Sequence, residues 1–291
     1  MLEDLQRWAG KPATHVDEDL DKWRELAKSQ GKRYADYGTQ VWIPGVARVI
    51  LPWAGAPYSP GQLARAYLKM QCWPWSLHRW EDWGLDPAPA IIFRGEAEAA
   101  WHYVDLSHAY WQIGSRLPWW VSKPGQTIEK RGVWRRADEF GSLRECRLAL
   151  FGQLTWPQPS TSWVDPDGEI MVSTVPAQKA RYGNRAWGTA TLMVVHAIAA
   201  EVMERFPDAA LWHTDGVLVP AERSDEVIAW LAKRWRIEAR VKEIGEGRVL
   251  GPGVYEWRET FREVRPTAMR LVWDQDLKLI RRWWLAYAPL P

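Results

Sequence analysis

The sequence has few cysteines and no long apolar run. Its 291 residues include only Cys72 and Cys146, which have neither metal-ligand spacing nor a disulfide framework and are typical of a reducing compartment. No apolar run approaches the ~20 residues that span a bilayer, and the first ten residues, MLEDLQRWAG, lack the apolar core of a signal peptide. We therefore expect a soluble cytoplasmic protein that does not act at a membrane.

A strong charge imbalance is also missing. The formal net charge is +2, so the overall charge does not mark a nucleic-acid-binding protein. Lysine and arginine are nevertheless in local excess between Lys123 and Arg147. Such a run suits a polyanion, although a solvated basic face is its commoner meaning.

Tryptophan is abundant, with 23 residues. Indole rings stack on nucleic-acid bases, but they also fill hydrophobic cores, and core packing is the expected role of most of them.

The pattern of apolar residues and caps predicts helices and strands in a mixed order. Helices are expected at 18–29, 59–71, 142–154, 187–206 and 224–235, and strands or hairpins at 45–53, 90–93, 101–106, 162–172, 211–220 and 237–244. This order indicates an α+β fold with a mostly antiparallel sheet.

Residues 211–220, LWHTDGVLVP, place a short polar turn between two strand-like runs. Asp and Gly tolerate the positive φ angles of tight turns, so Asp215 is either an ordinary turn former or a carboxylate held at a hairpin tip. A single carboxylate cannot hold a catalytic Mg²⁺ pair, so the second interpretation requires a partner. Asp105, at the end of the strand predicted at 101–106, is the candidate.

Three motifs resemble those of family B DNA polymerases, especially the short viral ones. Residues 105–112, DLSHAYWQ, are similar to the first palm motif of that family, with Asp and Tyr at the matching offsets and the Ser, Leu and Pro replaced. Residues 144–152, RECRLALFG, resemble the fingers motif, with Arg for Lys, Leu for Asn and Phe for Tyr. Residues 211–216, LWHTDG, resemble the Tyr-x-Asp-Thr-Asp-Ser hairpin, with His213 in place of the first Asp. The resemblance covers roughly residues 100 to 260.

The resemblance implies a template-directed DNA polymerase that adds dNTPs to a 3′ end. Asp105 and Asp215, with the Leu106 carbonyl, are then expected to bind two Mg²⁺ ions, for which Mn²⁺ substitutes, and which clamp the attacking and leaving oxygens of the transfer. Mg²⁺ leaves much of its coordination shell to water and phosphate, so two carboxylates suffice. The expected partners are a DNA template and primer, dNTPs and, where replication requires them, other replication proteins.

The resemblance also assigns residues to the nucleotide and to DNA. Arg144 is expected to bind the triphosphate with its planar fork, and Arg147, one turn on, either adds a contact or is a surface residue. Tyr110 matches the ring that excludes a ribose 2′-hydroxyl, with a core tyrosine as the alternative. Tyr255 loosely matches the element that contacts the primer duplex.

The domain organisation implied is that of a small right-hand polymerase. We expect a support region at 1–88, palm segments at 89–120 and 161–258, fingers at 121–160 and a thumb-like region at 259–291. In that last region Arg281 and Arg282 would lie near backbone phosphates, unless the segment is a plain amphipathic helix. The stretch before Asp105 is near the low end of the ~50 to 200 residues of a domain, so we expect no proofreading exonuclease.

Two other functions remain open at this level. One is a primase-like polymerase that starts chains de novo, against which Tyr110 argues mildly. The other is a DNA-binding palm whose catalytic site has decayed, suggested by the altered residues 144, 148 and 213. An assay of primer extension with and without Asp215 separates them.

Overall fold

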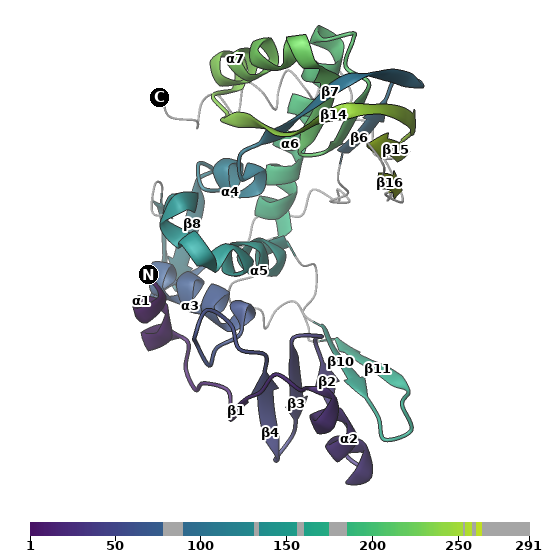
Figure 1. Ribbon diagram of the computed structural model, residues 1–291. Helices are drawn as coiled ribbons and strands as arrows, with labels where there is room; N and C mark the ends of the chain where they lie inside the picture. Colours follow the sequence, from purple (N-terminus) through teal and green to yellow (C-terminus); the bar gives the residue numbers. More distant parts are fainter. Residues whose placement is uncertain are drawn as a thin grey trace. The chain divides into compact units, whose positions relative to one another are not determined.

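A computed structural model describes residues 1–77, 90–130, 134–155, 160–174, 185–252, 254–257 and 260–263 (Figure 1). The chain divides into two compact units. The first comprises Met1–Trp80 and Trp119–Arg185, and the second comprises Glu81–Pro118 and Ala186–Pro291. Among the described strands only β1 and β4 pair in parallel, so the predicted α+β fold with mostly antiparallel sheets is confirmed.

The first unit combines helices with small sheets. Its helices are α1 (Leu2–Trp8), α2 (Asp21–Ser29), α3 (Pro60–Cys72), the 3₁₀ helix η1 (Ala137–Leu143) and α5 (Arg144–Thr155). Its strands are β1 (His15–Val16), β2 (Ala35–Asp36), β3 (Gln40–Ile43), β4 (Ala47–Ile50), β5 (Ser76–Leu77), β8 (Trp119–Lys123), β9 (Gln126–Lys130), β10 (Ser160–Val164) and β11 (Ile170–Thr174). They form three sheets, ordered β1-β4-β3-β2, β5-β8-β9 and β10-β11.

Helix α3 begins where its capping residues predict. The Ser59 hydroxyl accepts a hydrogen bond from the Gln62 amide at 3.3 Å, and the Gln62 side chain accepts one from the Ser59 amide at 3.0 Å. Pro60 occupies the first turn, where a missing N–H costs nothing. This capping box fixes the start of a helix that packs against both α1 and α5.

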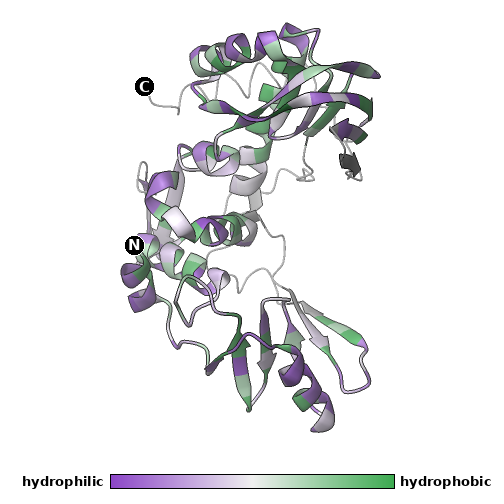
Figure 2. Ribbon diagram, in the orientation of Figure 1, coloured by the Kyte–Doolittle hydropathy of each residue, from purple (hydrophilic) through white to green (hydrophobic). Residues whose placement is uncertain are grey.

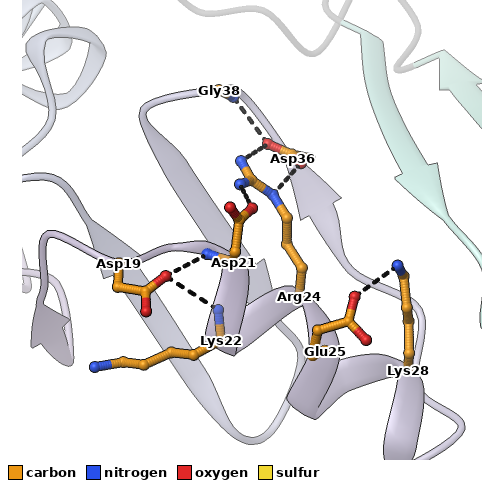
Figure 3. Close-up of polar contacts among 8 residues, drawn as sticks. All are labelled: Asp19, Asp21, Lys22, Arg24, Glu25, Lys28, Asp36 and Gly38. Carbon is orange, nitrogen blue, oxygen red and sulfur yellow. Dashed lines mark hydrogen bonds and ion pairs between the residues drawn. The ribbon is translucent and has the colours of Figure 1, made fainter.

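An ion-pair network ties α2 to the neighbouring strand β2 (Figure 3). Arg24 contacts Asp36 at 2.7 Å and Asp21 at 2.6 Å, and Asp36 also accepts a hydrogen bond from the Gly38 amide at 2.9 Å. The Arg24 guanidinium therefore holds the pKa of Asp36 below its usual value.

The second unit is built on one seven-stranded antiparallel sheet with the order β16-β15-β14-β7-β13-β12-β6. Its strands are β6 (Ala90–Phe93), β7 (Ala97–Leu106), β12 (Leu211–Thr214), β13 (Gly216–Pro220), β14 (Ala239–Gly251), β15 (Val254–Trp257) and β16 (Thr260–Glu263). Its helices are α4 (Ala109–Gly114), α6 (Arg185–Arg205), the 3₁₀ helix η3 (Ala221–Arg223) and α7 (Ser224–Trp235). Strand β14 runs to Gly251, beyond the end predicted at residue 244.

Helix α6 is apolar on nearly every side, as expected of a helix at the centre of a core. Its middle turns are buried almost throughout from Trp187 to Ala199. Helix α7 contacts β7 and β14 (Figure 1), where the His102 ring nitrogen Nδ1 lies 2.8 Å from the Ser224 hydroxyl. No helix in the described part of the chain is long and apolar enough to cross a membrane.

Candidate active site

Asp105 lies at the end of β7, a central strand of the seven-stranded sheet. It faces Gly216 of β13 on one side and Arg240 of β14 on the other. The residue is only 7% exposed. A carboxylate in this position is fixed by strands on both sides, and its burial indicates a specific electrostatic role.

Asp215 lies beside it at the tip of the β12–β13 hairpin. His213 pairs with Gly216, so the loop contains only Thr214 and Asp215. The Leu106 amide donates a hydrogen bond to the Asp215 carbonyl at 2.9 Å, which joins the tip to the end of β7. The fold therefore brings together the two aspartates that the sequence analysis singled out.

The electrostatics of Asp215 reflect this proximity. Burial and then the negative charge of Asp105 raise its pKa to about 6, while Lys242 opposes the change. Burial and then the charge of Asp215 also raise the pKa of Tyr110. Asp105, Asp215 and Tyr110 are thus close enough to share one electrostatic environment.

Three donors hold three successive carbonyls of the hairpin tip. The Tyr103 hydroxyl donates to the His213 carbonyl at 3.1 Å, the Trp212 indole to that of Thr214 at 3.2 Å, and the Leu106 amide to that of Asp215. Together they restrain the backbone around Asp215, as a preorganised site requires.

The strain of the turn lies on an unexpected residue. The sequence analysis attributed the turn to the tolerance of Asp and Gly for positive φ angles, but the positive φ, 60°, belongs to Thr214. A β-branched residue is unfavourable in this conformation and persists where its surroundings over-determine it. The sequence-based reason for the turn was therefore wrong in detail, although the hairpin itself is confirmed.

Gly216 is required for close packing rather than for a turn. A Cβ atom at this position would lie 2.5 Å from Cζ of Tyr103, because the tyrosine ring lies directly over the glycine backbone. The absent side chain leaves room for Tyr103 to reach the His213 carbonyl.

Lys242 belongs to the site, although the sequence analysis did not select it. Its ammonium lies 3.3 Å from Oδ1 of Asp105 and 5.8 Å from the centre of the Tyr103 ring. A β-bulge explains this position, because Val241 pairs with Val104 and Glu243 with Tyr103, which leaves Lys242 as the extra residue of β14. The alternating sequence of this strand carries no signal for the bulge.

Helix α4 places Tyr110 next to these strands. The Gln112 amide nitrogen donates to the Ser107 carbonyl at 2.8 Å, and its oxygen accepts from the Glu238 amide at 2.8 Å. Cζ2 of Trp187 would lie 2.6 Å from a Cβ atom on Gly114, so α4 also packs tightly on α6. Tyr110 is partly buried near Asp215, and its predicted contact with the sugar stays a prediction.

The two predicted phosphate-binding arginines lie on α5 in the first unit. Arg144 is exposed at the start of the helix. Arg147 is 7% exposed, donates to the Ala137 carbonyl at 2.6 Å and lies 5.7 Å from the centre of the Phe140 ring. The geometry gives Arg147 a structural role within its own unit, whereas Arg144 presents its charge to solvent.

The remaining predicted residues lie elsewhere. Tyr255 on β15 is 7% exposed and packs in a core cluster with Trp101 and Val249, so the structure shows a packing role and its DNA contact stays a prediction. Arg281 and Arg282 lie outside the described residues. His213 is partly buried, which lowers its pKa below the usual value.

The donor set fits a magnesium site of a particular kind. Among the described residues no group of three or more His, Cys, Asp or Glu side chains could hold a metal ion. The candidate site offers two carboxylates, and burial and then the charge of Asp105 raise the pKa of Asp215. Mg²⁺ is commonly bound through one or two carboxylates and completes its shell with water and substrate phosphates, so this arrangement suits it.

The sequence matches no protein-family model and no curated protein. Among solved structures, the chain is similar to the family B DNA polymerase from the hyperthermophilic archaeon Pyrobaculum calidifontis, with a TM-score of 0.41 and 14% sequence identity. The alignment covers 80% of this chain and 38% of that chain, so this protein spans well under half of the length of that polymerase. The polymerase is thus a distant structural neighbour.

Proposed function

We propose that the protein is a DNA polymerase that extends a 3′ end by two-metal nucleotidyl transfer on a right-hand fold. One observation carries the proposal: two carboxylates distant in sequence, Asp105 and Asp215, lie side by side where β7 ends and β13 begins. Burial, and then the charge of Asp105, raise the pKa of Asp215. A raised carboxylate pKa beside a second carboxylate marks a candidate functional site.

The chemistry requires positioning and charge stabilisation more than covalent catalysis. When bound, two Mg²⁺ ions would stabilise the negative charge on the attacking and leaving oxygens. Asp105 and Asp215 would hold the ions, with the Leu106 carbonyl as a further ligand. The donors on the hairpin carbonyls would keep Asp215 in place, so that little reorganisation is needed on binding.

The proposal assigns two further roles. The ring of Tyr110, partly buried near Asp215, would stand where it clashes with a ribose 2′-hydroxyl and so would favour dNTPs. The exposed guanidinium of Arg144 would bind triphosphate oxygens. Arg147 is left out of the catalytic machinery because its side chain is buried in the first unit.

One observation favours a second candidate, a DNA-binding protein without catalysis. The Lys242 ammonium already lies 3.3 Å from Asp105, so part of the carboxylate charge is balanced without a metal. If Lys242 neutralised the carboxylates completely, the site would not bind Mg²⁺.

Extension of a labelled primer on a DNA template with Mg²⁺ and dNTPs tests the proposal. We expect wild-type extension and a loss of at least about 10²-fold in Asp215→Asn and Asp105→Asn, because removal of one charge-stabilising group commonly costs 10²–10³. The control is Asp167→Asn, which removes an exposed carboxylate from another hairpin turn. A wild-type protein that binds primer-template but never extends it would support the non-catalytic candidate.

A further inference from the structure

Lys242 is held against Asp105 by a special feature of β14. In a regular strand each residue faces one partner, but the bulge between Val241 and Glu243 inserts Lys242 as an additional residue. Bulges redirect side chains and are common next to active sites. The direction of this lysine is therefore built into the strand pairing.

The ion pair is asymmetric in its exposure. The Asp105 side chain is 10% exposed, whereas the Lys242 side chain is 50% exposed. Asp105 is fixed at the end of a central strand, while the ammonium sits on a flexible stem that reaches solvent. The lysine can therefore leave the pair without burying its own charge, provided that another cation takes its place beside the buried Asp105.

Two carboxylates share this environment with one ammonium. The charge of Asp105 raises the pKa of Asp215, and the charge of Lys242 counteracts that effect. A divalent cation bound between the carboxylates would be repelled by the ammonium and would take its place as the positive neighbour of Asp105.

We propose that Lys242 is an internal counter-ion that competes with the divalent cation for Asp105 and moves to the triphosphate when the cation binds. This inference rests on the proposed function. The incoming nucleotide brings phosphate oxygens, which are the natural acceptors for a displaced ammonium next to a metal site. The lysine then weakens metal binding in the absence of nucleotide and strengthens nucleotide binding in the presence of metal.

Lys242 is thus a positioning residue that couples the binding of the divalent cation to the binding of the nucleotide. The Tyr103 ring, 5.8 Å from the ammonium, offers a second favourable contact while the ammonium changes partners. Loss of the lysine charge should strengthen the binding of the metal alone and weaken the binding of the nucleotide. Loss of a residue with only a structural role would not change these two affinities in opposite directions.

The test measures Mn²⁺ binding by electron paramagnetic resonance, without nucleotide, in the wild type and in Lys242→Met. Titration with a dATP analogue that has a non-hydrolysable α,β-bridge then follows at saturating Mn²⁺ and without primer. We expect Lys242→Met to bind Mn²⁺ about fivefold more tightly and the analogue about fivefold more weakly, the scale of one exposed ion pair. Lys242→Arg, which keeps the charge, should stay near the wild type in both measurements.

Arg248→Met is the matched control, because it removes an exposed cation from the same strand at a position that pairs with Glu98. Thermal unfolding confirms that each variant is folded. Tighter Mn²⁺ binding together with weaker analogue binding, in Lys242→Met alone, supports the proposal, and the absence of either change overturns it. If Mn²⁺ binds and Asp215→Asn abolishes the binding, the two-aspartate site stands whatever the result for Lys242. If neither the wild type nor Lys242→Met binds Mn²⁺, both this inference and the proposed function fail.

Discussion

Two hairpins of this protein carry an Asp next to a Gly in their turns, and they differ in almost every physical respect. The β10–β11 turn is Asp165-Pro166-Asp167-Gly168, and its positive φ, 89°, lies on Gly168. Asp165 accepts a hydrogen bond from the Glu169 amide at 2.8 Å and so stabilises its own turn. Here every residue fulfils the role that turn chemistry gives it.

The β12–β13 turn uses similar residues at a cost. Its positive φ falls on Thr214, its Asp215 is partly buried with a raised pKa, and its Gly216 lies under the Tyr103 ring. The β10–β11 hairpin, in contrast, is exposed: its apolar residues Ile170 and Val172 on β11 are 73% and 64% exposed (Figure 2). The comparison shows that the strain which neighbouring residues impose on a turn, rather than the amino-acid sequence of the turn, marks the candidate site.

The largest difference between the two hairpins is expected in the stability lost when the turn glycine, Gly216 or Gly168, is replaced by alanine. In Gly216→Ala the new Cβ would lie 2.5 Å from the Tyr103 ring, whose hydroxyl is tied to the His213 carbonyl. We expect a loss of about 2–3 kcal/mol in the free energy of unfolding, the usual cost of overpacking. Gly168→Ala meets no atom within 4 Å but keeps a φ of 89°, so we expect a loss of about 1 kcal/mol. Urea denaturation measures both.

A double variant identifies the cause of the larger loss. Tyr103→Leu removes the ring atom that clashes, so Gly216→Ala should be less destabilising in the Leu background than in the wild type. An equal loss in both backgrounds would show that Tyr103 is not the obstacle.

The next contrast concerns pH. The pKa of Asp215 is raised to about 6 in the folded protein, from 3.8 in the unfolded chain. The folded state therefore gains stability from binding this proton below pH 4 and loses that gain as the pH rises through 6. Asn carries no charge, so the stability of Asp215→Asn relative to the wild type should increase by about 2 kcal/mol between pH 4 and pH 8. Chemical denaturation at both pH values, with EDTA present, measures this change.

In the same denaturation experiment, Asp167→Asn is the control, because it removes a carboxylate from an exposed turn. A relative stability of Asp215→Asn that falls as the pH rises would contradict the assigned direction of the pKa change. The expected result also fits a general trade-off, since a functional carboxylate is often retained at the expense of stability.

Local patterns predicted the elements that caps or turn residues mark, whereas helices α1 and α4 and the β8–β9 pair were not predicted. The Ser59-Gln62 capping box gave the start of α3, and the turn residues gave both hairpins. The pairing of Asp105 with the β12–β13 hairpin was reached only through motif order, since no local rule joins strands so far apart in sequence. The alternation of apolar and polar residues also predicted that β14 ends at residue 244, whereas the strand continues to Gly251.

The details of the site depended on tertiary structure. The bulge that redirects Lys242, the Tyr103 ring over Gly216 and the burial of Arg147 are set by strands and helices that meet only in the fold. Burial cannot be read from a polar residue's identity, so the sequence did not indicate that the side chains of Arg147 and Tyr255 pack inside their units.

The smallest contrast is expected when Thr214 becomes glycine. Glycine adopts a φ of 60° without steric cost, whereas threonine does not. Part of this gain is offset because glycine has more freedom in the unfolded chain, so we expect a net stabilisation of about 0.5–1 kcal/mol by urea denaturation. Because glycine gives the hairpin tip more conformational freedom than threonine does, primer extension should decrease in the same variant although its stability increases. A variant that gains stability and keeps full activity would show that the donors on the three carbonyls position Asp215 without any contribution from the strained residue.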